Sequence, residues 1–105
     1  MIYERTTPSD IFILPLEVSE CDIIEITYKQ NDYVIVKRYE DGTLDDGMYL
    51  VEGGVAVMLT QEETDGFNDE SMVRIQVRVK TSEGAVLASC VYKVAVAETL
   101  NTEII

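Results

Sequence analysis

The chain has 105 residues, of which 47% are hydrophobic, and its formal net charge is -12, from 20 acidic and 8 basic residues. This size suits one domain spanning residues 1–105, and the hydrophobic content argues against wholesale disorder. A charge of this sign repels nucleic-acid phosphates and anionic membranes, so we expect neither as a partner. Histidine is absent, which removes the commonest general base and neutral metal ligand.

The first half of the chain predicts strands separated by turn residues. They cover 11–16, 21–29, 33–39, 48–51 and 55–60. Pro15 indicates an edge or a bend in the first strand. The sequence Gln30-Asn31-Asp32 predicts a hairpin turn, and Asp-Gly pairs at 41–42 and 46–47 predict further turns.

A helical turn interrupts this series. Thr60 and Glu63 have the spacing of a capping box, which predicts a short helix over Gln61–Asp65. Gly66 then favours a left-handed stop.

The clearest strand signal is Met72–Lys80. Val73, Ile75, Val77 and Val79 alternate with polar residues, so one face is expected to be buried and the other, with Arg74, Gln76, Arg78 and Lys80, exposed to water. Ser82-Glu83-Gly84 predicts a turn into a last long strand, Val86–Ala97.

About seven short strands with one helical turn predict an all-β fold, an immunoglobulin-like antiparallel β-sandwich. Two features depart from a true immunoglobulin domain. The third strand has no Trp, and Cys90 falls on the last strand.

The two cysteines, Cys21 and Cys90, match no metal spacing. Both flank or lie in apolar strands, so we predict reduced, unreactive thiols, with a disulfide between the sheets as the alternative. The N-terminal sequence MIYERTTPSD has no basic region followed by an apolar core, so we expect no signal peptide. No apolar run approaches the ~20 residues of a membrane span.

Candidate chemical sites are few. The Glu40–Asp46 loop is rich in carboxylates, but it lacks the spacing of an EF-hand, and a solvated loop is the default beside calcium binding. A second acidic group is interpreted as a capped turn and polar loop: Glu62, Glu63, Asp65, Asp69 and Glu70. We therefore predict no enzyme, no catalytic or metal-ligating residue and no cofactor.

The cations fall mostly on strands and the acids mostly in turns, with Glu25 the clear exception. This pattern predicts a basic sheet face that contacts acidic loops of another subunit, such as a second copy. The candidate interaction surface is Lys29, Arg74, Gln76, Arg78, Lys80 and Lys93. Apolar residues near the end of the chain, Leu100, Ile104 and Ile105, favour docking of this segment on a neighbour.

Three segments resemble small structural proteins of tailed phages and prophages. They are LPLEVSECDIIEITYKQND, VAVMLTQEETDGF and VRIQVRVKTSEGAVLAS. A strand ends in Gln30 before a hairpin, Leu59–Thr64 opens a helical turn, and Gln76-Val77-Arg78 leads into a Gly hairpin. The resemblance implies a β-sandwich of the tail or baseplate, found in the virion or the bacterial cytoplasm.

Two functions follow from these patterns. The first is a non-enzymatic phage structural or assembly module that acts through protein–protein contacts. The alternative is a module that binds a carbohydrate or a host surface molecule, for which a face lined by tyrosines would be expected. Tyr28, Tyr33, Tyr39 and Tyr49 lie on the predicted second to fourth strands, but without tryptophan and with this net charge we expect them to have a core or rim role.

Overall fold

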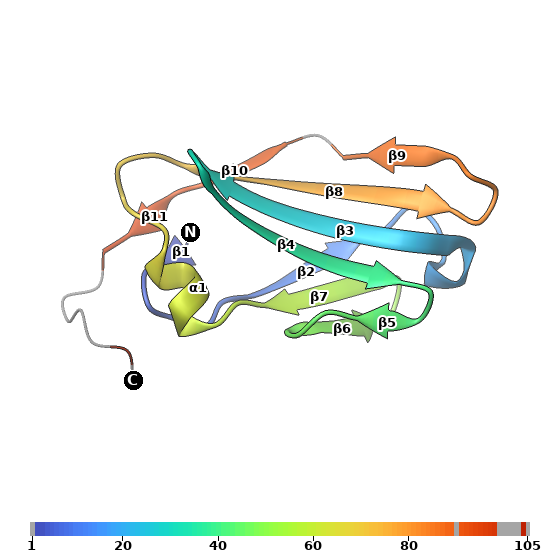
Figure 1. Ribbon diagram of the computed structural model, residues 1–105, viewed down its shortest axis with the longest axis horizontal. Helices are drawn as coiled ribbons and strands as arrows, with labels where there is room; N and C mark the ends of the chain where they lie inside the picture. Colours follow the sequence, from blue (N-terminus) through green and yellow to red (C-terminus); the bar gives the residue numbers. More distant parts are fainter. Residues whose placement is uncertain (1, 90, 99–103, 105) are drawn as a thin grey trace.

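The computed structural model describes residues 2–89, 91–98 and 104. Over these residues the fold is all-β, as predicted, with two facing layers of strands (Figure 1). The larger sheet has the order β10-β8-β3-β4-β5, with β9 also paired to β8, and the smaller has the order β2-β7-β6. A parallel pair, β1 and β11, lies at one end beside the helix (Figure 1).

The elements are β1 Ile2–Tyr3, β2 Ser9–Ile13, a 3-10 turn Val18–Glu20, β3 Cys21–Gln30, β4 Tyr33–Glu40, β5 Thr43–Leu44, β6 Met48–Val51, β7 Gly54–Met58, α1 Gln61–Asp65, β8 Val73–Thr81, β9 Val86–Ala88, β10 Tyr92–Val94 and β11 Val96–Ala97. Several are only two or three residues long. The described chain therefore contains more strands than the seven or so expected.

Two tight hairpins fix the register of the larger sheet. Gln30 pairs with Tyr33 across a two-residue turn in which Asn31 has φ 53°. The next turn places Asp41 at φ 48° and Gly42 at φ 87°, as a type I′ turn requires. Asn, Asp and Gly tolerate this left-handed backbone, so the turn residues recognised in the sequence determine which strands pair.

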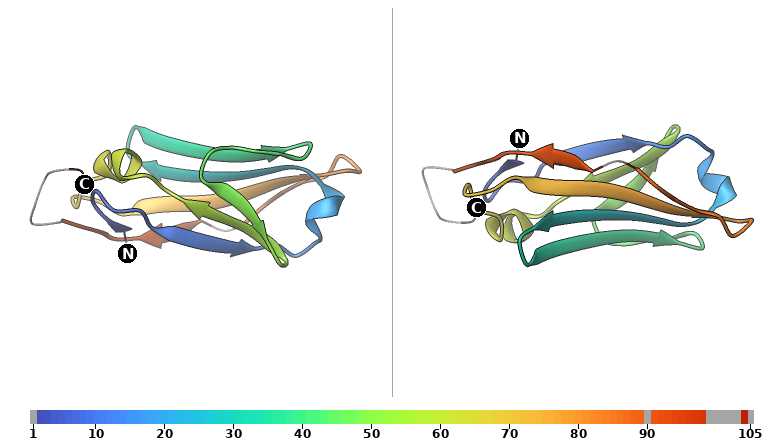
Figure 2. Two further views of the ribbon diagram at one scale, coloured as in Figure 1. Left: turned by 90° about the horizontal axis from the view of Figure 1, so that it is seen from below. Right: turned by 90° about the horizontal axis from the view of Figure 1, so that it is seen from above.

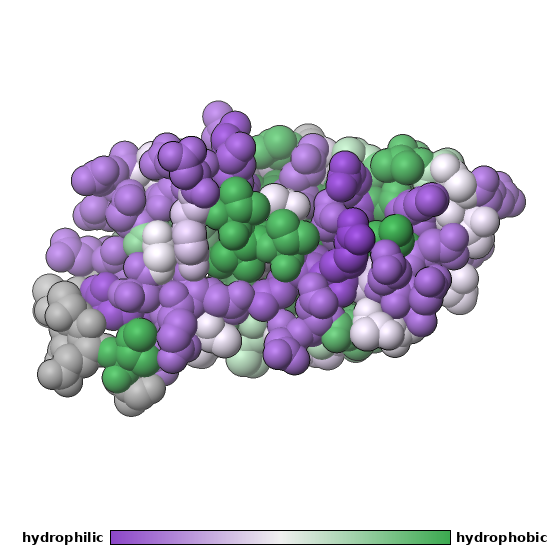
Figure 3. All heavy atoms as spheres, viewed as in Figure 1, coloured by the Kyte–Doolittle hydropathy of each residue, from purple (hydrophilic) through white to green (hydrophobic). Residues whose placement is uncertain are grey.

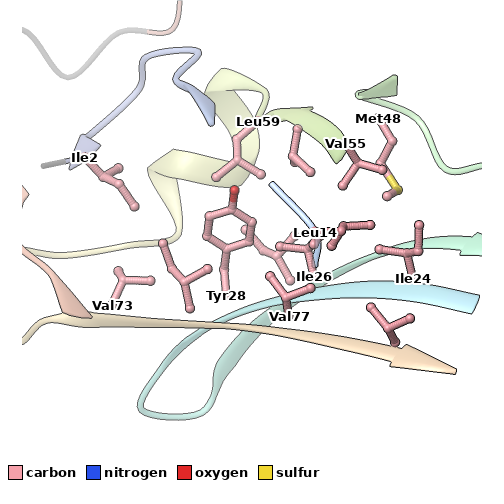
Figure 4. Packing of buried hydrophobic residues seen from close by; sticks show 14 of the residues in the cluster. Ile2, Leu14, Ile24, Ile26, Tyr28, Met48, Val55, Leu59, Val73 and Val77 are labelled. Atoms are coloured by element: carbon pink, nitrogen blue, oxygen red, sulfur yellow. The ribbon is translucent and has the colours of Figure 1, made fainter. Parts of the chain in front are cut away.

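The core lies between the two sheets (Figure 4). Val73, Ile75, Val77 and Val79 of β8 are all buried, which confirms the predicted face of this strand. They pack with Ile24, Ile26 and Tyr28 of β3 and, from the other sheet, with Val55 and Val57 of β7. Of the predicted exposed residues, Gln76 is half-buried, because its Nε2 donates to Ser89 O at 3.1 Å.

The last strand is not continuous, and the predicted Val86–Ala97 strand is wrong in this respect. β9 and β10 both pair with β8, but Arg78 lies opposite Ala88 while Ile75 lies opposite Tyr92. The register with β8 therefore shifts by one residue between Ala88 and Tyr92. This irregularity reverses which residues point inward, because side chains alternate along a strand.

The helix α1 forms as predicted. The Thr60 hydroxyl accepts from the Glu63 N–H, and the Glu63 carboxylate accepts from the Thr60 N–H, which completes the capping box. The predicted left-handed stop at Gly66 is wrong, since its φ is -74°. Glycine is needed there for space instead, because a Cβ at this position would collide with the ring of Tyr33.

One side of the sandwich is closed and the other is open. On the closed side the chain crosses from β5 of the larger sheet to β6 of the smaller sheet through a short turn, in which Met48 N–H donates to Asp45 O. On the other side, β2 and β10 lie along the same margin of the molecule without pairing (Figure 2).

Candidate interaction surfaces

The outer face of the larger sheet carries a row of three cations. Arg74 of β8 lies directly opposite Lys29 of β3 and opposite Lys93 of β10. Directly opposed residues share a face, and like charges so placed repel one another. None of the three makes an ion pair within the part of the chain that the structure describes. We call Lys29, Arg74 and Lys93 the basic row.

The other predicted surface residues are placed differently. Arg78 donates to Glu25 Oε1 at 2.7 Å, and Arg38 donates to Glu25 Oε2 at 2.9 Å. Burial would raise the pKa of Glu25, but the hydrogen bonds from the two arginines outweigh it and lower that pKa. Arg78 is thus engaged within its own chain. Lys80 is exposed, between Ile23 and Val86 in the register.

The second acidic group has structural roles at α1. Glu63 accepts from Lys37 Nζ at 2.8 Å, and Asp65 accepts from Arg5 at 3.0 Å. Lys37 lies on the inner face of β4 and is 9% exposed, so it does not contribute to a basic outer face. Burial alone would raise the pKa of Glu63, but hydrogen bonds from Lys37 and Thr60 reverse this and lower it.

The Glu40–Asp46 loop forms the β4–β5 hairpin, and Asp45 accepts from the Arg38 N–H at 2.8 Å. Nowhere in the described residues do three acidic, Cys or His side chains gather as metal ligands would. Cys21 is a buried free thiol, and burial, with Glu20 and Asp22 nearby, raises its pKa. Cys90 lies outside the described residues.

The four tyrosines do not share a surface. Tyr28 is fully buried, while Tyr33 and Tyr39 pack against the core. Tyr33 forms an edge-to-face contact with Phe67, with ring centroids 5.2 Å apart. Of these four tyrosines, only Tyr49 is exposed. The arrangement expected for stacking on a sugar is not formed by these residues.

The outer face of the smaller sheet is apolar, which the sequence analysis missed. Ile11 of β2 and Tyr49 of β6 both lie opposite Ala56 of β7, and all three share this face. We call this surface the apolar face; its residues are Ile11, Ile13, Tyr49, Val51, Ala56 and Met58. Ala56 is fully buried by its neighbours, whereas Ile11 is 63% and Ile13 71% exposed.

The apolar face differs from the side of the molecule in Figure 3. That side is mostly hydrophilic, and its largest hydrophobic group is surrounded by polar side chains. A signal for the apolar face was present in the sequence. Ile11-Phe12-Ile13-Leu14 is apolar on both faces of a strand, a pattern typical of strands covered on both sides. In a sandwich of two layers, one of these faces must point outward.

A groove follows the open side of the sandwich. It has a volume of about 540 Å³ and lies between β2 and the β8–β10 edge. Phe12, Leu14 and Leu16 line one wall, and Val77, Leu87 and Tyr92 line the other. The core is therefore accessible from the side on which β2 has no neighbour.

Comparison with known proteins finds no matching protein family, no curated relative and no similar solved structure. Within the described residues, no helix has the length and apolar character needed to cross a membrane.

Proposed function

We propose that this chain is a non-enzymatic assembly module that acts through contacts with other protein subunits, including its own copies. The observation that carries the proposal is the apolar face. Monomeric soluble proteins rarely expose contiguous apolar surface of this kind unless it contacts a partner. Ile11 and Ile13 are more than half exposed and share the outer face of the smaller sheet with the exposed Tyr49 and Met58.

The basic row supports the same proposal. Three adjacent cations lower stability, and an acidic partner segment would neutralise them. The chain itself carries acidic turns, such as Asp45-Asp46, that suit this role. A setting in a tailed-phage particle is the finer form of the proposal, and its support is the sequence resemblance alone.

Sedimentation velocity over a range of protein concentrations tests the proposal. Wild type should form species larger than the monomer. The double variant Tyr49→Lys/Met58→Lys should associate less than wild type, because it places charges on the apolar face. The matched control is Tyr3→Lys/Met72→Lys, which replaces side chains that are 51% and 48% exposed and lie outside both the apolar face and the basic row.

Two salts distinguish association through the apolar face from association through the basic row. Sodium sulfate strengthens apolar association, whereas sodium chloride screens the attraction of the basic row. A wild type that stays monomeric at the highest soluble concentration contradicts assembly with its own copies. Association that survives unchanged in the Tyr49/Met58 variant contradicts the role of the apolar face.

A further inference from the structure

β2 is an edge strand with one side unpaired. Among the described residues it pairs only with β7. Two hydrogen bonds fix the direction of its main-chain groups: Leu14 N–H donates to Gly53 O at 2.9 Å, and Leu59 N–H donates to Pro8 O at 3.1 Å. Residues that bond the partner alternate with residues that point away from it. Ser9, Ile11 and Ile13 therefore direct their N–H and C=O groups toward the open side.

Of the features that normally prevent pairing, this edge has only one, the inward charge of Asp10. Exposed edges are usually blocked by a lysine, a proline, a bulge or an inward charge. Pro8 and Pro15 lie just outside β2, and the strand contains no cation. Its one charged residue, Asp10, accepts a hydrogen bond from Tyr28 of the facing sheet. The edge is thus flanked by prolines but open along its length.

We propose that two copies of this chain form a two-fold dimer in which β2 pairs antiparallel with β2 of the second copy, centred on Ile11. The inference depends on the proposed function and names the partner as a second copy. In this register Ile11 faces its own counterpart, and Ser9 faces Ile13. Each main-chain group that points outward from these three residues then meets a complementary group.

The side chains are compatible with this register. On the outer face, Ile11 packs beside Ile11 of the copy and Ile13 packs beside Ser9. On the inner face, Asp10 lies opposite Phe12, so no like charges are directly opposed. The two three-stranded sheets join into one six-stranded sheet, and their apolar faces become continuous. The second copy also covers the open side of the groove that Phe12 and Leu14 line.

Cysteine cross-linking tests the register. In a hydrogen-bonded antiparallel pair the Cα atoms are about 5.5 Å apart, which is within the range of a disulfide. The variant Ile11→Cys should therefore form a bridge to itself on mild oxidation. Mass spectrometry of the bridged peptide distinguishes it from a bridge through Cys21 or Cys90.

Ile13→Cys is the matched control, because its two copies would be offset by four positions, on the order of 13 Å along the strands. A mixture of Ser9→Cys and Ile13→Cys should form the mixed bridge. We expect at least ten-fold more self-bridge from Ile11→Cys than from Ile13→Cys. Equal yields, or no bridge from Ile11→Cys, overturn the pairing.

A proline variant separates main-chain pairing from apolar contact. Ile11→Pro removes an N–H that bonds nothing in β7, while Ile11→Ala keeps the N–H and also loses the large side chain. Sedimentation should show a monomer for Ile11→Pro and a weakened dimer for Ile11→Ala. If circular dichroism shows that Ile11→Pro is unfolded, Ile13→Pro takes its place.

Equal dissociation of the proline and alanine variants overturns the pairing. Association that is lost in Tyr49→Lys/Met58→Lys but unchanged in Ile11→Pro also overturns it, and leaves assembly through the apolar face intact. A monomeric wild type contradicts both proposals.

Discussion

The hydroxyl of Tyr28 donates to the carboxylate of Asp10 at 2.9 Å and thereby joins the two sheets through the core. Burial raises the pKa of Tyr28 above its usual range, and Asp10 adds to this effect, so the hydroxyl remains a donor at all ordinary pH values. The bond also holds β2 with its Asp10 side inward.

Tyr28→Phe should lower the free energy of unfolding by about 1.5–3 kcal/mol, the usual range for a hydrogen bond to a charged group. The ring is kept, so packing changes little. Urea denaturation measures the loss. Tyr49→Phe is the control, because its hydroxyl contacts Ser9 at the surface. A similar loss in both variants would contradict a special role for the buried bond.

The side chain of Gln30 forms hydrogen bonds to the main chain of the loop that follows α1. Its Nε2 donates to Asn68 O and Ser71 O, each at 2.7 Å, and its Oε1 accepts from Asn68 N–H at 2.9 Å. Gln30→Leu should cost on the order of 3 kcal/mol, because a buried side chain loses three hydrogen bonds to main-chain groups. Thermal and urea unfolding measure this cost. Gln76→Leu, which removes one bond of a half-buried side chain, should cost clearly less.

Val77 is 8% exposed and lies on the inner face of β8. Val77→Asp should cost on the order of 3 kcal/mol or more, because it places an unpaired charge in the core. Lys80→Asp on the outer face of the same strand should have a small effect. Wild-type-like melting of the Val77 variant would show that β8 does not bury this face.

Acid should destabilise the fold through Glu63. Its folded-state pKa lies below the ordinary value of 4.5, so its contribution is complete above pH 4.5 and is lost as the pH falls through the folded pKa. Glu25 acts with the same sign. The free energy of unfolding, measured from pH 7 to pH 3, should decrease once the pH falls below 4.5. Lys37→Met should reduce the slope of the unfolding free energy against pH in this range. An unchanged slope would mean that the Lys37–Glu63 pair does not cause the loss of stability in acid.

Cys21 should react with a thiol reagent only after unfolding, because it is buried and its pKa is raised. The titration compares native and denatured protein, and the variant Cys90→Ser assigns the signal to Cys21. Rapid reaction of Cys21 in the native protein would contradict its burial.

The local sequence was sufficient to predict those features in which one residue pattern permits only one conformation. The alternation in β8 determines its buried face, since a shift of one residue would reverse every side chain. Thr60 and Glu63 determine the start of α1, and Asn31 and Asp41 determine the hairpin turns. These features depend on neighbours in the chain and are readable without the rest of the fold.

Tertiary structure decided the features that depend on pairing between distant segments. β2 is apolar on both faces, and only its pairing with β7 and the Tyr28–Asp10 bond place Ile11 outward. Pairing of β3 with both β4 and β8 puts Glu25 between two arginines, which removes Arg78 from the free basic surface. It also aligns Lys29, Arg74 and Lys93, which are far apart in sequence, in one row. The order and register of strands are long-range properties, and these set the surfaces on which the proposed function depends.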